Sequence, residues 1–128
     1  MSGAPDRVLL VDDDPAIRAV TEATLRVIGG FDVTSAPGGE RAIDICREQG
    51  FDLLLIDVMM PHIDGPATIR AMRSEDLLDS MPFVFLTAKV DSESRHALLS
   101  LGAARVIAKP FDPAELVEQI RSVMGRRN

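Results

Sequence analysis

The sequence predicts a doubly wound α/β fold, in which five parallel strands form one sheet with helices on both faces. Short β-type runs alternate with longer segments of helical period, and this alternation occurs five times along 128 residues. The third run, Leu53–Asp57, does not alternate apolar and polar residues, which is typical of a strand covered on both faces. Each parallel crossover is right-handed and needs a helix to return the chain. Five such units therefore predict a sheet between two helical layers.

The first expected strand is Arg7–Val11, and the first helix follows it directly. Asp14 is typical of an N-cap, and Pro15 is favoured at the first helical position. Gly29 and Gly30 then end the helix. Residues that recur at helical spacing within it are Ile17, Val20, Thr24, Val27 and Ile28.

The second and third units follow the same order. Phe31–Ala36 is the second expected strand, and Gly39–Glu48 is a helix that Gly50 ends. After the third strand comes a loop, Pro61–Pro66, that contains Pro and Gly, and then a helix that runs to about Arg73.

Two more units complete the expected fold. Strand Phe83–Thr87 precedes a helix capped by Asp91 or Ser92, and strand Arg105–Ala108 precedes a last helix capped by Asp112. The apolar face of the last helix is expected to contain Leu116, Val117, Ile120, Val123 and Met124.

Composition limits the cellular context. We expect one domain over residues 1–128, with a core at about 6–124 and loose ends at 1–5 and 125–128. The net charge of −6 and the pI of about 4.8, without clustered bases, argue against direct nucleic-acid binding. Cys46 is the single cysteine and cannot form an internal disulfide, and no N-terminal apolar run resembles a signal peptide. The apolar runs are far shorter than the roughly 20 residues that span a bilayer. We therefore expect a cytoplasmic protein without a membrane segment.

Polar residues stand at the carboxyl ends of four of the five expected strands. Asp12 and Asp13 follow the first strand, Asp57 ends the third, Thr87 ends the fourth, and Lys109 follows the fifth. Because ligands of such sheets bind outside the carboxyl ends of the strands, we expect these side chains to form one site.

Three carboxylates in one site repel one another, so the site should raise a pKa or bind a cation. Mg²⁺ accepts one or two carboxylates, keeps several waters and leaves room for phosphate oxygens. The site therefore indicates phosphate chemistry. Asp57 is the candidate nucleophile, because carboxylates form aspartyl phosphates. Lys109 and Thr87 would stabilise charge on the transferring phosphoryl group.

Four short motifs lie at these strand ends. They are Val-Asp-Asp at 11–13, Ile-Asp-Val-Met-Met-Pro at 56–61 with Asp64-Gly65, Leu-Thr-Ala at 86–88, and Ala-Lys-Pro-Phe at 108–111. In this order the chain resembles the receiver domain of two-component response regulators over nearly its whole length. The resemblance implies a flavodoxin-like sheet with strand order 2-1-3-4-5 and five helices.

The resemblance also implies a role for each motif residue. Asp57 would accept a phosphoryl group from a phosphohistidine of a sensor histidine kinase or histidine phosphotransfer protein. The implied Mg²⁺ ligands are Asp12, Asp13, Asp57 and the backbone carbonyl of Met59. Thr87 would be the switch hydroxyl, and Lys109 would pair with the phosphoryl group. Such a module is not an enzyme acting on other molecules, since it catalyses only its own phosphorylation and dephosphorylation.

The expected output face for a downstream protein consists of the fourth helix, the fifth strand and the fifth helix. Three residues before Lys109, where the family often has Tyr or Phe, this chain has Val106. We hypothesise that the signal passes instead through Thr87, the following loop and the helix from about Ser92 to Leu101. The resemblance further implies a cis peptide bond between Lys109 and Pro110.

One alternative belongs to a different functional class. Asp12-Asp13-Asp14 after an apolar strand resembles the first motif of haloacid-dehalogenase-type phosphohydrolases, with Asp12 as the nucleophile. Pro15 stands where that superfamily usually has Thr or Val, and Asp57 would have no role. The sequence also leaves open whether the chain acts alone or is part of a longer regulator.

Overall fold

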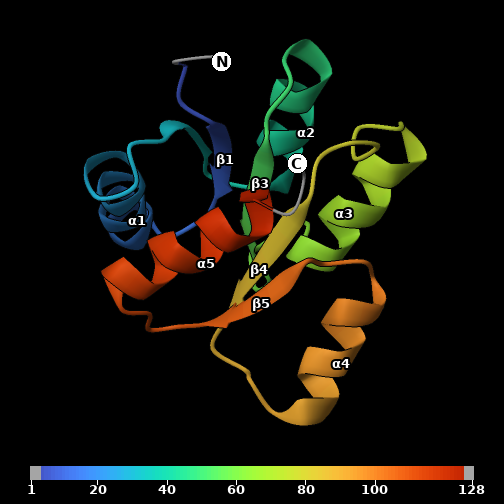
Figure 1. Ribbon diagram of the computed structural model, residues 1–128. Helices are drawn as coiled ribbons and strands as arrows, with labels where there is room; N and C mark the ends of the chain where they lie inside the picture. Colours follow the sequence, from blue (N-terminus) through green and yellow to red (C-terminus); the bar gives the residue numbers. More distant parts are fainter. Residues whose placement is uncertain (1–3, 126–128) are drawn as a thin grey trace.

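The computed structural model describes residues 4–125 and contains a five-stranded parallel sheet, shown in Figure 1. Its strand order is β2-β1-β3-β4-β5, which confirms the expected order. The strands are β1 (Arg7–Val11), β2 (Asp32–Ala36), β3 (Leu53–Asp57), β4 (Phe83–Thr87) and β5 (Arg105–Ala108).

Five helices cover the two faces of the sheet. They are α1 (Pro15–Val27), α2 (Gly39–Glu48), α3 (Gly65–Ser74), α4 (Ser92–Ser100) and α5 (Pro113–Gly125). Helices α1 and α5 pack on one face, and α2, α3 and α4 pack on the other (Figure 1). The doubly wound α/β fold is therefore confirmed.

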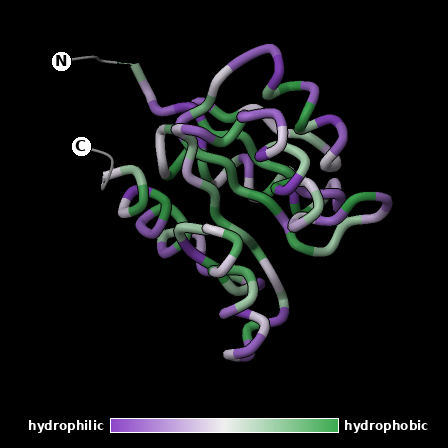
Figure 2. Tube along the Cα trace, turned by 90° about the vertical axis from the view of Figure 1, so that its right-hand side faces the viewer, coloured by the Kyte–Doolittle hydropathy of each residue, from purple (hydrophilic) through white to green (hydrophobic). Residues whose placement is uncertain are grey.

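The central strands are buried on both faces. Leu53 and Leu55 belong to the apolar cluster under α1 and α5, whereas Leu54 and Ile56 belong to the cluster under α2, α3 and α4. All four are fully buried. Figure 2 shows hydrophobic stretches running through the middle of the molecule. This double burial explains why the apolar run of β3 does not alternate with polar residues.

Side-chain caps fix where four helices begin, and one of them, Asp64 at the start of α3, was not predicted. The Asp14 carboxylate accepts hydrogen bonds from the amides of Ala16 and Ile17, and Asp112 accepts one from the amide of Glu115. Asp91, not Ser92, caps α4. The predicted caps are thus confirmed, because each short acidic side chain satisfies amides that have no partner within the helix.

Several boundaries differ slightly from the prediction. Strand β2 begins at Asp32 instead of Phe31, and α3 begins at Gly65, so Pro66 lies in its first turn. Gly125, expected in a loose end, is the last residue of α5. Of the other residues expected to be loose, 1–3 and 126–128 lie outside the described part of the chain.

Of the residues that recur at helical spacing, helix α1 buries only Thr24. Its buried residues are Thr21, Thr24 and Leu25, whereas Val20 is 61% exposed and Val27 is 82% exposed. The hydroxyls of both threonines donate to carbonyls four residues earlier in the same helix, so they carry no unsatisfied donor into the core. The helix is therefore rotated so that an apolar stripe remains on the surface.

The peptide bond between Lys109 and Pro110 is cis, as expected. Among residues 4–125, no helix combines the length and the apolar content that a membrane crossing requires.

Candidate functional site

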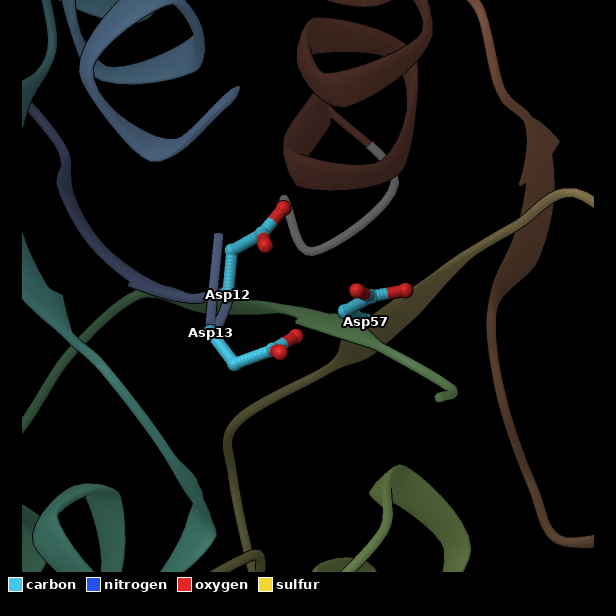
Figure 3. A group of neighbouring side chains, drawn as sticks. All are labelled: Asp12, Asp13 and Asp57. Carbon is cyan, nitrogen blue, oxygen red and sulfur yellow. The ribbon is translucent and has the colours of Figure 1, made fainter. Parts of the chain in front are cut away.

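The carboxyl ends of β1 and β3 bring three carboxylates together. Asp12 and Asp13 follow β1, and Asp57 is the last residue of β3. One carboxylate oxygen from each residue lies within 4.8 Å of the other two. Figure 3 shows the three side chains gathered at the ends of these strands. The expected acidic cluster is therefore present.

A single lysine lies against this cluster. Lys109 Nζ is 3.1 Å from Asp57 Oδ2 and 3.5 Å from Asp12 Oδ2. The Lys109 side chain is 18% exposed, and both carboxylates are buried. Solvent and salt screen such a pair less than they screen a surface ion pair. One lysine charge faces three carboxylates, so the cluster keeps a negative excess.

Burial and charge shift the protonation of both partners. Burial raises the pKa of Asp57, the charges of Asp12 and Asp13 raise it further, and Lys109 opposes the rise. For Lys109, burial favours the neutral form, but the hydrogen bond and charge of Asp57 outweigh it and raise the Lys109 pKa. The free site therefore disfavours the ionised Asp57 carboxylate, which a bound cation would stabilise.

The donor set fits a hard divalent cation. Asp12 is fully buried, and its Oδ1 accepts a hydrogen bond from the amide of Asp14 at 2.9 Å. Its Oδ2 is also buried and has no hydrogen-bond partner within residues 4–125. Lys109 Nζ, at 3.5 Å, is an ion-pair partner of this oxygen but does not hydrogen-bond to it. A buried carboxylate oxygen without a hydrogen bond is unfavourable, and a cation coordinated by several oxygens would remove that penalty.

Thr87 and Met59 lie at the same edge of the sheet. Thr87, the last residue of β4, is 2% exposed, and its Oγ1 accepts a hydrogen bond from the Lys89 amide at 3.0 Å. Its hydroxyl hydrogen remains a donor. Met59 lies in the loop after β3, and its side chain is 73% exposed.

Gly65 shapes the loop after Asp57. A Cβ at this position would lie 2.5 Å from the Asp57 carbonyl oxygen, and the Gly65 amide donates to the Val58 carbonyl at 2.9 Å. No larger residue fits this approach without a backbone shift. The sequence analysis used the Asp64-Gly65 pair only as part of a motif and did not predict this close contact.

Sequence reasoning missed one residue at the site. Arg18 Nη1 in α1 donates a hydrogen bond to the Asp12 carbonyl oxygen at 2.8 Å. The sequence places Arg18 simply as one of several polar residues in α1, and no local motif indicates the contact.

Comparisons with known proteins show which family the chain resembles. The family model described as the response regulator receiver domain matches residues 8–121. Among curated proteins, the chain is 40% identical over 121 residues to a probable transcriptional regulator, ycf27, of Porphyridium aerugineum. That match covers 94% of this chain and 49% of the relative, so the chain spans about half the length of such relatives.

Solved structures show the same fold. The receiver domain of sensor histidine kinase PA1611 from Pseudomonas aeruginosa PAO1, which has a magnesium ion coordinated in its active site cleft, is 33% identical. Its TM-score is 0.85, with 95% of this chain and 99% of that chain covered. Chemotaxis protein CheY4 of Vibrio cholerae is 30% identical, with a TM-score of 0.87 and coverage of 94% and 99%.

These relatives support the receiver interpretation and not the phosphohydrolase alternative with Asp12 as nucleophile. The family model spans most of the chain, and the two structural relatives cover 94% and 95% of it. The chain therefore belongs to the response regulator receiver domains, the signalling modules of two-component systems.

Proposed function

We propose that Asp57 accepts a phosphoryl group from a phosphohistidine donor and that this modification switches a protein-binding face. The observation that carries the proposal is the buried Asp57 carboxylate with Lys109 Nζ at 3.1 Å and two further carboxylates beside it. In this setting the Lys109 ammonium can stabilise the charge of an added phosphoryl group, and the three carboxylates can bind a metal cation.

The transfer is a displacement at phosphorus. A carboxylate oxygen of Asp57 forms the new P–O bond, the P–N bond of phosphohistidine breaks, and imidazole leaves with the electron pair. Lys109 pairs with the phosphoryl oxygens, and Thr87 donates its hydroxyl hydrogen to one of them. In this proposal Asp12, Asp13, Asp57 and the Met59 backbone carbonyl hold Mg²⁺. Bound Mg²⁺ would neutralise phosphoryl charge in the transition state.

Catalysis in this proposal serves only the phosphorylation and dephosphorylation of Asp57. The magnesium-bound receiver of PA1611 supports the metal assignment by similarity. From this chain itself, the buried Asp12 Oδ2 supports it, because this oxygen accepts no hydrogen bond within residues 4–125 and has Lys109 Nζ only at 3.5 Å.

The same geometry suggests how the signal leaves the site. Thr87 Oγ1 accepts from the Lys89 amide, and this bond holds the start of the loop between β4 and α4. If Thr87 turns toward a phosphoryl group, the bond breaks and the loop is free to move. Val106 is 2% exposed and packs in the core under α2, α3 and α4, so the position where the family often has Tyr or Phe carries no aromatic ring. We infer that α4, β5 and α5 form the output face for a downstream protein.

A groove beside the site suits the donor protein. It has a volume of about 670 Å³ and lies between the start of α1 and the loop between β5 and α5, with Lys109 in its wall. Ile17 and Val20 from α1 line it opposite Pro110 and Phe111. This is part of the apolar stripe that α1 leaves on the surface. A donor that brings its phosphohistidine to Asp57 would cover it.

Phosphorylation of the purified protein tests the central proposal. After incubation with Mg²⁺ and a small phosphodonor, mass spectrometry should locate one phosphoryl group on Asp57, and Asp57→Asn should remain unmodified. Phosphate on Asp12, or none on the unsubstituted protein, would contradict the proposal.

The donor groove has a separate test. Val20→Lys should slow transfer from a phosphorylated histidine kinase about tenfold or more, because a charge would be buried at that interface. Phosphorylation by a small phosphodonor should be unchanged, since that reaction does not need the groove. Equal loss with both donors would contradict the groove assignment.

A further inference from the structure

Arg18 connects α1 to the acidic end of β1. Its guanidinium Nη1 donates to the Asp12 carbonyl oxygen at 2.8 Å, across six residues of chain. The side chain is half-buried. The acceptor is the carbonyl of the peptide that joins Asp12 to Asp13, the two acids that follow β1.

The position of this peptide decides where both carboxylates point. A peptide group is planar, so an anchored carbonyl oxygen fixes the plane from which the Asp13 backbone continues. On the other side, the Asp12 amide donates to the Ala36 carbonyl at 3.2 Å, which ties Asp12 to β2. The Asp14 amide donates to Asp12 Oδ1, which fixes the Asp12 side chain. Arg18 supplies the side-chain contact that fixes the carbonyl between the two acids.

We infer that Arg18 is a positioning residue, which holds the Asp12–Asp13 peptide so that both carboxylates face the site and bind a divalent cation more tightly. This inference rests on the metal site of the proposed function. Within residues 4–125, the Arg18 hydrogen bond goes to a peptide carbonyl and not to a carboxylate of the cluster. Arg18 acts through the peptide that carries two of the cation's ligands, as outer hydrogen bonds do around metal ligands in general.

The direction in which Mg²⁺ affinity changes when Arg18 is replaced distinguishes a positioning role from a purely electrostatic one. A guanidinium close to the acidic cluster repels a divalent cation, so its charge alone weakens cation binding. Removing that charge should therefore tighten Mg²⁺ binding if Arg18 acts only as a charge. Removing it should weaken Mg²⁺ binding if Arg18 acts by orienting the peptide.

Arg26 offers a matched control within the same helix. Its Nη2 donates to the Val33 carbonyl oxygen at 2.7 Å, so it also bonds an α1 side chain to a backbone carbonyl of the sheet region. Val33 lies in β2, away from the acidic cluster. Replacing Arg26 therefore removes a comparable bond without touching the Asp12–Asp13 peptide.

The experiment measures Mg²⁺ affinity by calorimetric titration, without any phosphodonor, and the unfolding midpoint in urea for each variant. We expect Arg18→Met to weaken Mg²⁺ binding about tenfold. Arg18→Lys keeps one donor and the charge, and it should recover part of the affinity. Arg26→Met should leave Mg²⁺ affinity unchanged although it lowers the unfolding midpoint.

Unchanged or tighter Mg²⁺ binding in Arg18→Met would overturn the inference, as would an equal loss of affinity in Arg26→Met. If Arg18→Met does not fold, wild-type Mg²⁺ affinity in Arg18→Gln and Arg18→Lys together would overturn it. The outcome is independent of phosphoryl transfer. A protein that binds Mg²⁺ but is never modified on Asp57 would contradict the proposed function and leave the role of Arg18 standing.

Discussion

Helices α4 and α5 pack on opposite faces of the sheet beside β5, but they are attached to it very differently (Figure 1). Helix α5 buries five side chains, whereas Leu98 is the single buried residue of α4. Buried apolar contacts largely set how readily a segment opens locally. Helix α5 therefore belongs to the rigid frame of the domain, whereas α4 is an element that a small change at the site can move.

The two ends of α4 also differ. At its carboxyl end, Arg73 donates to the Leu101 carbonyl, and its guanidinium lies 6.0 Å from the centre of the Phe83 ring. At its amino end, α4 covers a mostly apolar hollow of about 370 Å³ that reaches Thr87. Helix α4 is thus anchored at the end far from the phosphorylation site. Its free end lies next to the residue expected to sense the phosphoryl group.

The largest expected effect is a difference between two identical substitutions. Leu116→Ala in α5 should destabilise the protein by about 4 kcal/mol, because Leu116 is fully buried among residues with little room to relax. Leu98→Ala in α4 should cost about 2 kcal/mol, since a thinly packed helix can relax over the vacated space. Urea unfolding measures both, and equal losses would contradict the contrast between the helices.

Removing the anchor of α4 should cost less. Arg73→Met loses the hydrogen bond to the Leu101 carbonyl, worth about 1 kcal/mol. Hydrogen exchange at α4 amides should accelerate, while exchange at α5 amides should follow only the change in global stability. The control is Arg70→Met, because Arg70 is an exposed arginine that lies in α3 like Arg73. Uniform acceleration across both helices would show that Arg73 does not anchor α4 specifically.

Replacing Asp57 in the acidic cluster should raise the stability of the protein, whereas the substitutions above lower it. Because the folded state raises the pKa of Asp57, its ionised carboxylate destabilises the fold in the absence of a bound cation. This penalty is absent below the ordinary Asp pKa of about 4 and grows as the pH rises through the raised pKa. Without Mg²⁺, Asp57→Asn should therefore stabilise the protein at pH 7.

Thermal unfolding between pH 4 and pH 8 tests this prediction. The gain in Asp57→Asn should shrink toward zero at the acidic end of the range. Saturating Mg²⁺ should raise the midpoint of the unsubstituted protein more than that of the variant, because a ligand stabilises the state that binds it. A gain that does not depend on pH would contradict the assignment of the raised pKa to Asp57.

The smallest expected change concerns conformation and not stability. Phosphorylation should shift the amide resonances of residues 88–97 more than those of residues 116–124. The reason is that Thr87 Oγ1 accepts a hydrogen bond from Lys89 in the loop that precedes α4, whereas α5 buries five side chains. Thr87→Ala should abolish the difference. Unchanged resonances in α4 would contradict the proposed route of the signal.

The sequence predicted which acidic residues and which lysine meet at the site. Asp12, Asp57 and Lys109 stand at strand ends, and parallel strands present those ends at one edge, so their proximity followed from the fold class alone. The Arg18 contact was not predictable. It depends on the path by which the chain turns from β1 into α1, and no residue pattern encodes that path.

By itself, the sequence determined the order of strands and helices along the chain, the caps of α1, α4 and α5, and the acids at the strand ends. These features depend on local chemistry, such as a carboxylate that bonds free amides or an apolar run without alternation. Only the tertiary structure decided which face of α1 is buried. Helical period identifies an apolar stripe on a helix but not which way the helix turns that stripe relative to the sheet. Leu25 reaches the core because the sheet and α5 pack against its side of α1. Val20 remains exposed for the same reason, since burial is settled by the partner surface and not by the helix alone.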